Sequence, residues 1–125
     1  MILALHHVQL AMPRGGEPAA RQFYGGVLGL PEVAKPAALA GRGGCWFESG
    51  ELRLHLGVET PFVPARKAHP GLQVADLSEL CARLDRHGIA VTPDAALPGL
   101  RRVHVADPFG NRLELLELLA PGPSG

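Results

Sequence analysis

The sequence predicts an α+β fold built from two tandem βαβββ modules, and three observations support this prediction. A length of 125 residues is enough for one domain that buries a core without disulfide bonds. The order strand, helix, three strands can be followed twice along the chain. Residues that can carry chemistry also recur at corresponding places in the two halves. An internal repeat of this kind constrains the fold more than any single element does.

The first module begins with a strand pattern and continues with a helix pattern. Residues 3–12 alternate between two faces, with His7 and Gln9 on the same face. A helix is expected over residues 17–30, with Pro18 in its first turn and Gly29 at its end. Three further strands are predicted at residues 31–35, 44–49 and 51–58.

The second module repeats this order. Its first strand is expected at residues 69–75, and its helix at 76–88 begins with Asp76 and Glu79 at the N-cap and N3 spacing. Further strands are predicted at residues 89–93, 101–106 and 111–119. The predicted organisation is one domain with module one at 1–58, a linker at 59–68, module two at 69–119 and a short tail at 120–125.

The composition narrows the classes of function. Twelve basic and twelve acidic residues give a formal net charge of zero, which does not favour binding to nucleic acid or to an anionic membrane. The apolar runs are shorter than the roughly 20 residues that a membrane-spanning helix needs. The first residues lack the basic region and cleavage site of a signal peptide, so we expect a cytoplasmic protein. Cys45 and Cys81 have no metal or disulfide spacing and are expected to be small apolar side chains.

The repeat places four candidate metal ligands at corresponding positions. His7 opens the first module, and His55 lies in its last strand, 48 residues later. His69 opens the second module, and Glu114 lies in its last strand, 45 residues later. If the two modules pair about a two-fold axis, the four side chains can converge on one point. Neutral imidazoles and a carboxylate are suitable ligands for Zn, Ni, Fe or Mn.

Other polar residues are candidates for roles around such a site. His104 alternates with Arg102 on a predicted strand and could orient substrate or shuttle a proton; a core or surface histidine is the competing interpretation. Gln9, which shares the face of His7, is a candidate for lining a substrate pocket, and Arg102 is a candidate for binding substrate. Arg66 could attract an anionic substrate group, although a solvated linker charge is the safer interpretation.

Two questions about the first module are left open by the pattern. His55 could bind a metal, or it could only hydrogen-bond substrate or water. Trp46 and Phe47 alternate, so one of them belongs to the core and the other faces away from it.

Three stretches resemble the vicinal oxygen chelate superfamily: "HHVQLAM" at the start, "FYGGVLGL" in the first helix and "DPFGNRLELLE" near the end. This superfamily includes glyoxalase I, extradiol dioxygenases, fosfomycin-resistance thiol transferases and bleomycin-binding proteins. The resemblance covers almost the whole chain. It implies two βαβββ modules whose curved mixed sheets close around a divalent metal, commonly in a homodimer whose sites draw ligands from both subunits.

The resemblance also implies roles for individual residues. His7 and His69 match the ligands on the first strands of the two modules, and Glu114 matches the carboxylate on the last strand. His55 stands where glyoxalase I usually has Glu or Gln, so this chain departs from the two-His, two-acid set of that enzyme.

The expected activity is that of a metal-dependent lyase or isomerase on a small vicinal-oxygen substrate such as a thiol hemithioacetal. Glu114 would serve as ligand and base in that reaction. Three alternatives remain open: an Fe(II) extradiol-type dioxygenase using His7, His69 and Glu114, a fosfomycin-type thiol transferase, or a protein that sequesters a ligand without catalysis.

Overall fold

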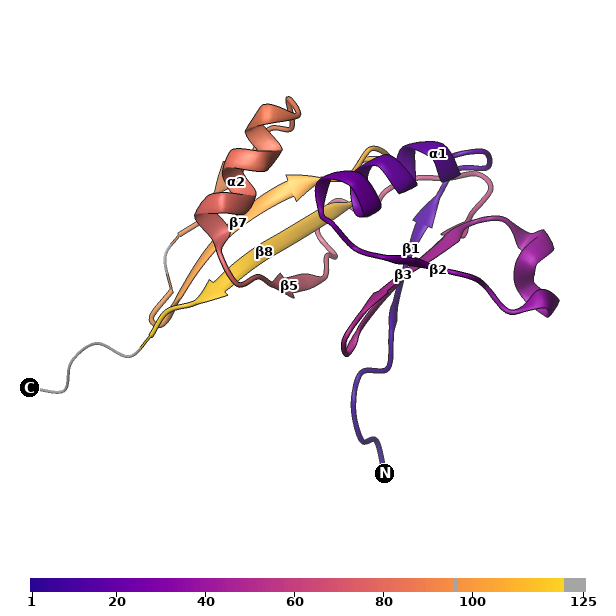
Figure 1. Ribbon diagram of the computed structural model, residues 1–125, viewed down its shortest axis with the longest axis horizontal. Helices are drawn as coiled ribbons and strands as arrows, with labels where there is room; N and C mark the ends of the chain where they lie inside the picture. The colour runs from indigo at the N-terminus through magenta and orange to yellow at the C-terminus, as the bar shows by residue number, and fades with distance from the viewer. Residues whose placement is uncertain (96, 121–125) are drawn as a thin grey trace, which may run out of the picture. The chain divides into compact units, whose positions relative to one another are not determined.

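The computed structural model describes residues 1–95 and 97–120, and Figure 1 shows their path. The chain divides into two compact units. The first contains Met1–Pro64 together with Pro108–Asn111, and the second contains Ala65–Asp107 together with the chain from Arg112 onward. The short loop 108–111 therefore connects two strands of the second unit but belongs to the first, where the Asn111 side chain donates to the Ala11 carbonyl at 2.7 Å.

The first unit contains a four-stranded mixed sheet. Its order is β1-β4-β3-β2, with β1 parallel to β4 and the other pairs antiparallel. The strands are β1 (Val8–Met12), β2 (Glu32–Val33), β3 (Cys45–Ser49) and β4 (Leu52–Val58).

A helical segment covers one face of this sheet. Helix α1 (Glu17–Ala20), which has Pro18 in its first turn, continues as the π-helical η1 (Arg21–Val27). A short 3₁₀ segment, η2 (Ala37–Arg42), follows β2. The helix and the sheet bury a common core, in which each large side chain contributes about 1.5–3 kcal/mol. That core contains Met12, Phe23, Tyr24, Val27, Cys45, Phe47, Leu54 and Leu56.

The second unit contains a sheet of the same design. Its order is β5-β8-β7-β6, again with one parallel pair, β5 with β8. The strands are β5 (Gly71–Gln73), β6 (Thr92–Pro93), β7 (Leu100–Ala106) and β8 (Arg112–Leu118). The two mixed sheets, each with its helix, confirm the predicted α+β class with two βαβββ units.

Helix α2 (Leu77–Arg86) begins as the sequence predicts. The Asp76 side chain accepts a hydrogen bond from the Glu79 backbone N–H at 3.0 Å, the N-cap interaction expected from their spacing. A second acceptor comes from β8, where Glu117 Oε1 accepts from the Leu77 N–H at 2.8 Å. Two of the free N–H groups at this helix start are thus satisfied by carboxylates. Among the described residues, neither this helix nor any other is long and apolar enough to cross a membrane.

The parallel strand pair of each sheet has the same register relative to the candidate ligands. In the parallel pairs, Gln9 lies opposite His55 and Gly71 lies opposite Glu114. His7 and His69 each stand two residues before these partners. His55 and Glu114 therefore occupy equivalent positions, as the sequence spacing indicated.

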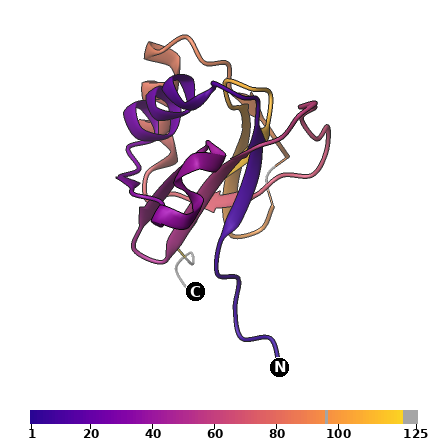
Figure 2. The ribbon, with the colours of Figure 1, turned by 90° about the vertical axis from the view of Figure 1, so that its right-hand side faces the viewer.

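The first strand is shorter than expected. The prediction of a strand from residue 3 is wrong at its start, because β1 begins only at Val8, which pairs with Leu54. Residues 1–7 form no strand and are exposed, and the start of the chain extends away from the sheet of its unit (Figure 1, Figure 2). An alternating pattern becomes a strand only where a neighbour accepts its backbone hydrogen bonds, and β4 offers register positions from Leu54 onward.

Candidate metal centre

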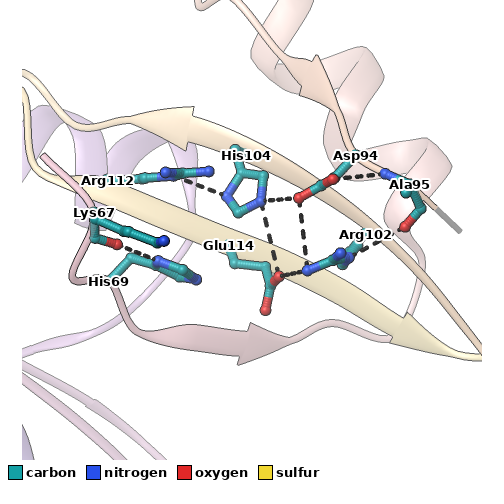
Figure 3. A network of polar contacts seen from close by, with 8 residues as sticks. All are labelled: Lys67, His69, Asp94, Ala95, Arg102, His104, Arg112 and Glu114. Carbon is teal, nitrogen blue, oxygen red and sulfur yellow. Dashed lines mark hydrogen bonds and ion pairs between the residues drawn. The ribbon is translucent and has the colours of Figure 1, made fainter. Parts of the chain in front are cut away.

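The polar face of the second sheet carries the candidate site, because strand alternation separates it from the core. Val103 on β7 and Leu115 on β8 face the buried side. His104 and Glu114 point to the other side and lie directly opposite each other in the register. Figure 3 shows them with the polar side chains around them.

His69, His104 and Glu114 form the candidate metal-binding cluster. Each offers one ligand atom, and these atoms all lie within 4.8 Å of one another. His69 precedes β5 and is exposed, whereas the His104 side chain is buried and that of Glu114 is 13% exposed. The sequence predicted His69 and Glu114 as ligands and His104 as a neighbouring acid or base, and the structure brings all three together.

The orientation of His69 leaves one ring nitrogen available. Its Nδ1 lies 2.7 Å from the Lys67 carbonyl oxygen. A carbonyl only accepts, so the proton of a neutral His69 resides on Nδ1 and the lone pair on Nε2. A backbone carbonyl that fixes the tautomer in this way is typical of metal-binding histidines.

The Glu114 carboxylate lies over Gly71. A side-chain Cβ at that position would be only 3.1 Å from Glu114 Oε2, so the missing side chain makes room for the carboxylate. The other oxygen, Oε1, accepts from Arg102 Nη1 at 2.9 Å. Arg102, predicted to bind substrate, therefore offsets the charge of Glu114 in this structure.

His104 has partners on both ring nitrogens. Its Nδ1 accepts from Arg112 Nε at 3.3 Å, and its Nε2 lies 2.6 Å from Asp94 Oδ2. A guanidinium only donates, so Nδ1 holds the lone pair and Nε2–H donates to the Asp94 carboxylate. The Ala95 N–H, the hydrogen bond from His104 and the charge of Arg102 lower the pKa of Asp94, with the Ala95 contact the largest cause.

The donor set fits a divalent metal. Two imidazoles and one carboxylate suit Zn, Ni, Fe or Mn. His69 Nε2 and Glu114 Oε2 can serve as ligands while their other atoms keep the hydrogen bonds described above. His104 can join them through Nε2 only if that atom gives up its proton and its bond to Asp94.

The other two predicted ligands lie together in the first unit. His55 is 4% exposed, and its Nε2 lies 3.0 Å from Glu48 Oε2. Its ring stacks on Trp46 with centroids 3.9 Å apart, and on His7 with centroids 4.8 Å apart. The convergence of all four predicted ligands on one point stays a prediction.

A cavity of about 260 Å³ lies in the same unit, and Gln9 is one of the residues that line it. Trp46 lines it, whereas Phe47 is fully buried in the core, which answers the question left open by the sequence. Arg66 is exposed.

Sequence reasoning missed Asp94, Arg112 and Glu48. Arg112 is two residues from Glu114 on one strand, so alternation alone could have placed it on the same face. Asp94 and Glu48 reach their histidines across strand pairs, and the alternation within one strand does not show which residues of the neighbouring strand it meets.

Comparisons with known proteins agree with the fold. The profile of the Glyoxalase/Bleomycin resistance protein/Dioxygenase superfamily matches residues 4–115. A crystal structure described as a glyoxalase family protein from Bacillus anthracis is 46% identical, with a TM-score of 0.91, over 94% of this chain and 97% of that one. No protein with a curated description matches this chain.

Two more distant structures are also similar. Lactoylglutathione lyase from Agrobacterium tumefaciens is 25% identical, with a TM-score of 0.70, over 91% of this chain and 92% of that one. The fosfomycin resistance protein FosX from Listeria monocytogenes is 16% identical, with a TM-score of 0.74 and 94% of each chain covered. The second similarity is one of fold alone.

Proposed function

Because the chain belongs to the glyoxalase/bleomycin resistance protein/dioxygenase superfamily, we propose that it is a divalent-metal-dependent lyase or isomerase. Its substrate would be a small molecule with two adjacent oxygen atoms, such as a thiol hemithioacetal. The observation that carries the proposal is the cluster of His69, His104 and Glu114 within 4.8 Å. The similarity to lactoylglutathione lyase from Agrobacterium tumefaciens supports the reaction class.

His69 and Glu114 are the central ligands in this proposal. His7 and His55 are proposed as their counterparts from the first module, because they occupy equivalent positions of an equivalent sheet. His104 then acts beside the metal as a hydrogen-bond donor that orients the substrate rather than as a ligand. The support for that role is the protonation of its Nε2, which the Arg112 contact at Nδ1 favours.

A bound divalent ion would supply Lewis-acid stabilisation of an oxyanion that forms on the substrate. Residues of the chain would move the proton and orient the substrate. The Glu114 carboxylate can accept a proton from the substrate carbon, while Arg102 stabilises its charge before the transfer. Glu114 can then return that proton to the neighbouring carbon. His104 Nε2–H can donate a hydrogen bond to the substrate oxygen on which charge develops, and Asp94 orients the imidazole.

Replacing Glu114 with Gln tests the proposal. The change keeps the shape and removes the charge, so we expect the metal content of the purified protein to fall at least tenfold, or about 1.4 kcal/mol. Turnover of a methylglyoxal–thiol hemithioacetal with Ni, Co or Zn should fall with it. Elemental analysis and a spectrophotometric assay measure the two quantities.

The matched control is Glu51→Gln, which removes an exposed carboxylate at the β3–β4 turn. It should keep the metal content and turnover of the unmodified protein. A protein that turns over no hemithioacetal with any metal or thiol would contradict the proposed reaction. A protein that binds no divalent ion in stoichiometric amount would favour ligand sequestration instead.

A second candidate function is an Fe(II)-dependent ring-cleaving dioxygenase. It is favoured by one observation, the two-histidine, one-carboxylate composition of the cluster, which is the pattern of non-heme iron oxygenases. Oxygen consumption by iron-loaded protein in the presence of catechols would support it. Hemithioacetal turnover without oxygen consumption would exclude it in favour of the first proposal.

We also propose that the protein forms a homodimer with shared sites. The support is the extended start of the chain, where Met1, Ile2, Leu3 and Leu5 are more than 80% exposed although they are apolar. A second copy of the chain would bury them at a gain of roughly 25 cal/mol for each Å² of apolar surface.

A further inference from the structure

The first unit contains a cavity for which the proposed metal-dependent reaction assigns no ligand. It lies on the side of the first sheet that carries His55 and continues to the loop around η2. Its volume of about 260 Å³ suits a small molecule rather than a peptide. Its lining includes the polar side chains of Gln9, Lys35 and Arg42, which come from three different segments of the unit.

Two positive charges border the cavity. Lys35 follows β2, and its ammonium group donates a hydrogen bond to the Gly43 carbonyl. Arg42, at the end of η2, is exposed and also lines the cavity. The nearby Glu17 carboxylate accepts from the Gly44 N–H at 3.0 Å and offsets part of this charge. The balance of two cations and one carboxylate favours a ligand with a single negative charge.

An aromatic surface forms another part of the lining. The Trp46 indole is parallel to the His55 imidazole within 3°, with ring centroids 3.9 Å apart. His55 is in turn held by Glu48 at 3.0 Å. This stack holds the indole in a defined plane, and its second face is the one that a planar ligand would use.

A glycine makes room for an amide in the lining of the cavity. A Cβ at Gly57 would lie 2.6 Å from Gln9 Nε2, so the missing side chain leaves space for the Gln9 amide over β4. The amide offers one donor and one acceptor group to a ligand in the cavity.

We propose that this cavity binds a small planar organic monoanion, such as an aromatic or conjugated carboxylate. The anionic group lies between Lys35 and Arg42, and the planar body lies against Trp46. The inference goes beyond the proposed function, because the binding that it describes needs no metal, although the cavity lies on the face that carries the proposed ligand His55. It predicts that the protein distinguishes an anion from a neutral molecule of the same shape.

The test uses the intrinsic fluorescence of Trp46, the only tryptophan in the chain. Full-length protein, freed of metal by a chelator that is then removed, is titrated with benzoate and with benzamide. We expect saturable quenching by benzoate, with a Kd about fivefold or more below that of benzamide, since an anion gains charge-assisted hydrogen bonds. Raising the salt concentration should weaken the binding of benzoate.

Two substitutions test whether Lys35 and Arg42 bind the anionic group of the ligand. Arg42→Gln and Lys35→Met should each weaken benzoate binding about threefold or more. Arg14→Gln, which removes an exposed cation elsewhere in the same unit, should leave the Kd unchanged. Because Lys35 also holds the Gly43 carbonyl, circular dichroism checks the fold of that variant. The exposed Arg42 keeps the test informative if Lys35→Met unfolds.

Three results would overturn the proposal: no saturable quenching by benzoate, equal binding of benzoate and benzamide, or benzoate binding that folded Arg42→Gln protein retains in full. The experiment is performed without metal. Its failure would therefore leave the proposed metal-dependent function untouched, and failure of the hemithioacetal assay would leave this cavity untouched.

Discussion

At the residue scale, Trp46 and His104 occupy equivalent positions of the two sheets and give them different chemistry. Trp46 is opposite His55 on β4, and His104 is opposite Glu114 on β8. The first pair stacks two rings and leaves an aromatic surface beside a cavity. The second pair joins an imidazole and a carboxylate in a network of charged groups. A repeated backbone therefore supports a binding surface in one unit and a candidate metal site in the other.

Glu17 gives a prediction of pH dependence at this scale. Its carboxylate accepts from the Gly44 N–H, which is the main cause that lowers its pKa from the ordinary value of 4.5. A lowered pKa means that the ionised form stabilises the fold above the pKa of the unfolded chain, and that this stabilisation disappears as the pH falls through the folded pKa.

Glu17→Gln should therefore reduce the free energy of unfolding at pH 7 by less than about 1 kcal/mol, because the side chain is partly exposed. The curves of variant and unmodified protein should converge as the pH falls below the folded pKa. Urea unfolding at a series of pH values measures the difference. A difference that stays constant from pH 7 to pH 3 would contradict this account.

At the element scale, the entry to β3 depends on a glycine that has no substitute. Gly44 has a φ of +83°, in the left-handed region. A Cβ there would lie 2.1 Å from the Leu56 carbonyl oxygen, which is backbone of the neighbouring strand and cannot move aside. The close approach sets the start of the β3–β4 pairing, in which Cys45 lies opposite Leu56.

We expect Gly44→Ala to destabilise the protein by at least about 3 kcal/mol, through backbone strain and the clash together. Thermal or urea unfolding measures this loss. The control is Gly26→Ala in η1. An added Cβ there would have no side chain or distant backbone atom within 4 Å, and the φ of Gly26 is not positive. That change should leave the stability equal or raise it by about 0.5–1 kcal/mol. Equal effects of the two substitutions would show that the close approach is unimportant.

At the scale of the whole molecule, the proposed shared sites can be tested by mixing two inactive variants. His7→Ala and Glu114→Ala each remove one proposed ligand, so each homodimer should bind little metal. In a heterodimer with shared sites, one site loses both ligands and the other keeps both. Random co-assembly should restore about a quarter of the metal content, because half of the dimers are mixed and each has one intact site.

The outcome distinguishes sites that are shared between two chains from sites that each chain builds by itself. If each chain builds its own site, the mixed sample should bind no more metal than the separate variants. Analytical ultracentrifugation of the unmodified protein supplies the reference, since a monomeric protein would contradict the shared-site proposal directly. Asp85→Ala, an exposed change on α2, serves as the control that leaves both sites intact.

Much of the fold follows from local patterns in the sequence. The pattern of residues 51–58 predicts a strand, which the structure has at Leu52–Val58, and the spacing of Asp76 and Glu79 predicts the start of α2. Both patterns act over a few neighbouring residues, so they need no knowledge of the rest of the chain. The repeat then gives the order of the elements, and the matching registers show why His55 and Glu114 stand at equivalent positions.

The contacts that give each unit its chemistry depend on tertiary structure. The sequence by itself determined the two βαβββ units and the residues His69 and Glu114 as candidate ligands. Only the tertiary structure decided that Asp94 holds His104, that Arg102 pairs with Glu114, and that Trp46 rather than Phe47 lines the cavity. Strand pairing causes this division, because the side chains that meet across a strand pair depend on turn geometry and on the face that is buried as well as on the alternation within one strand.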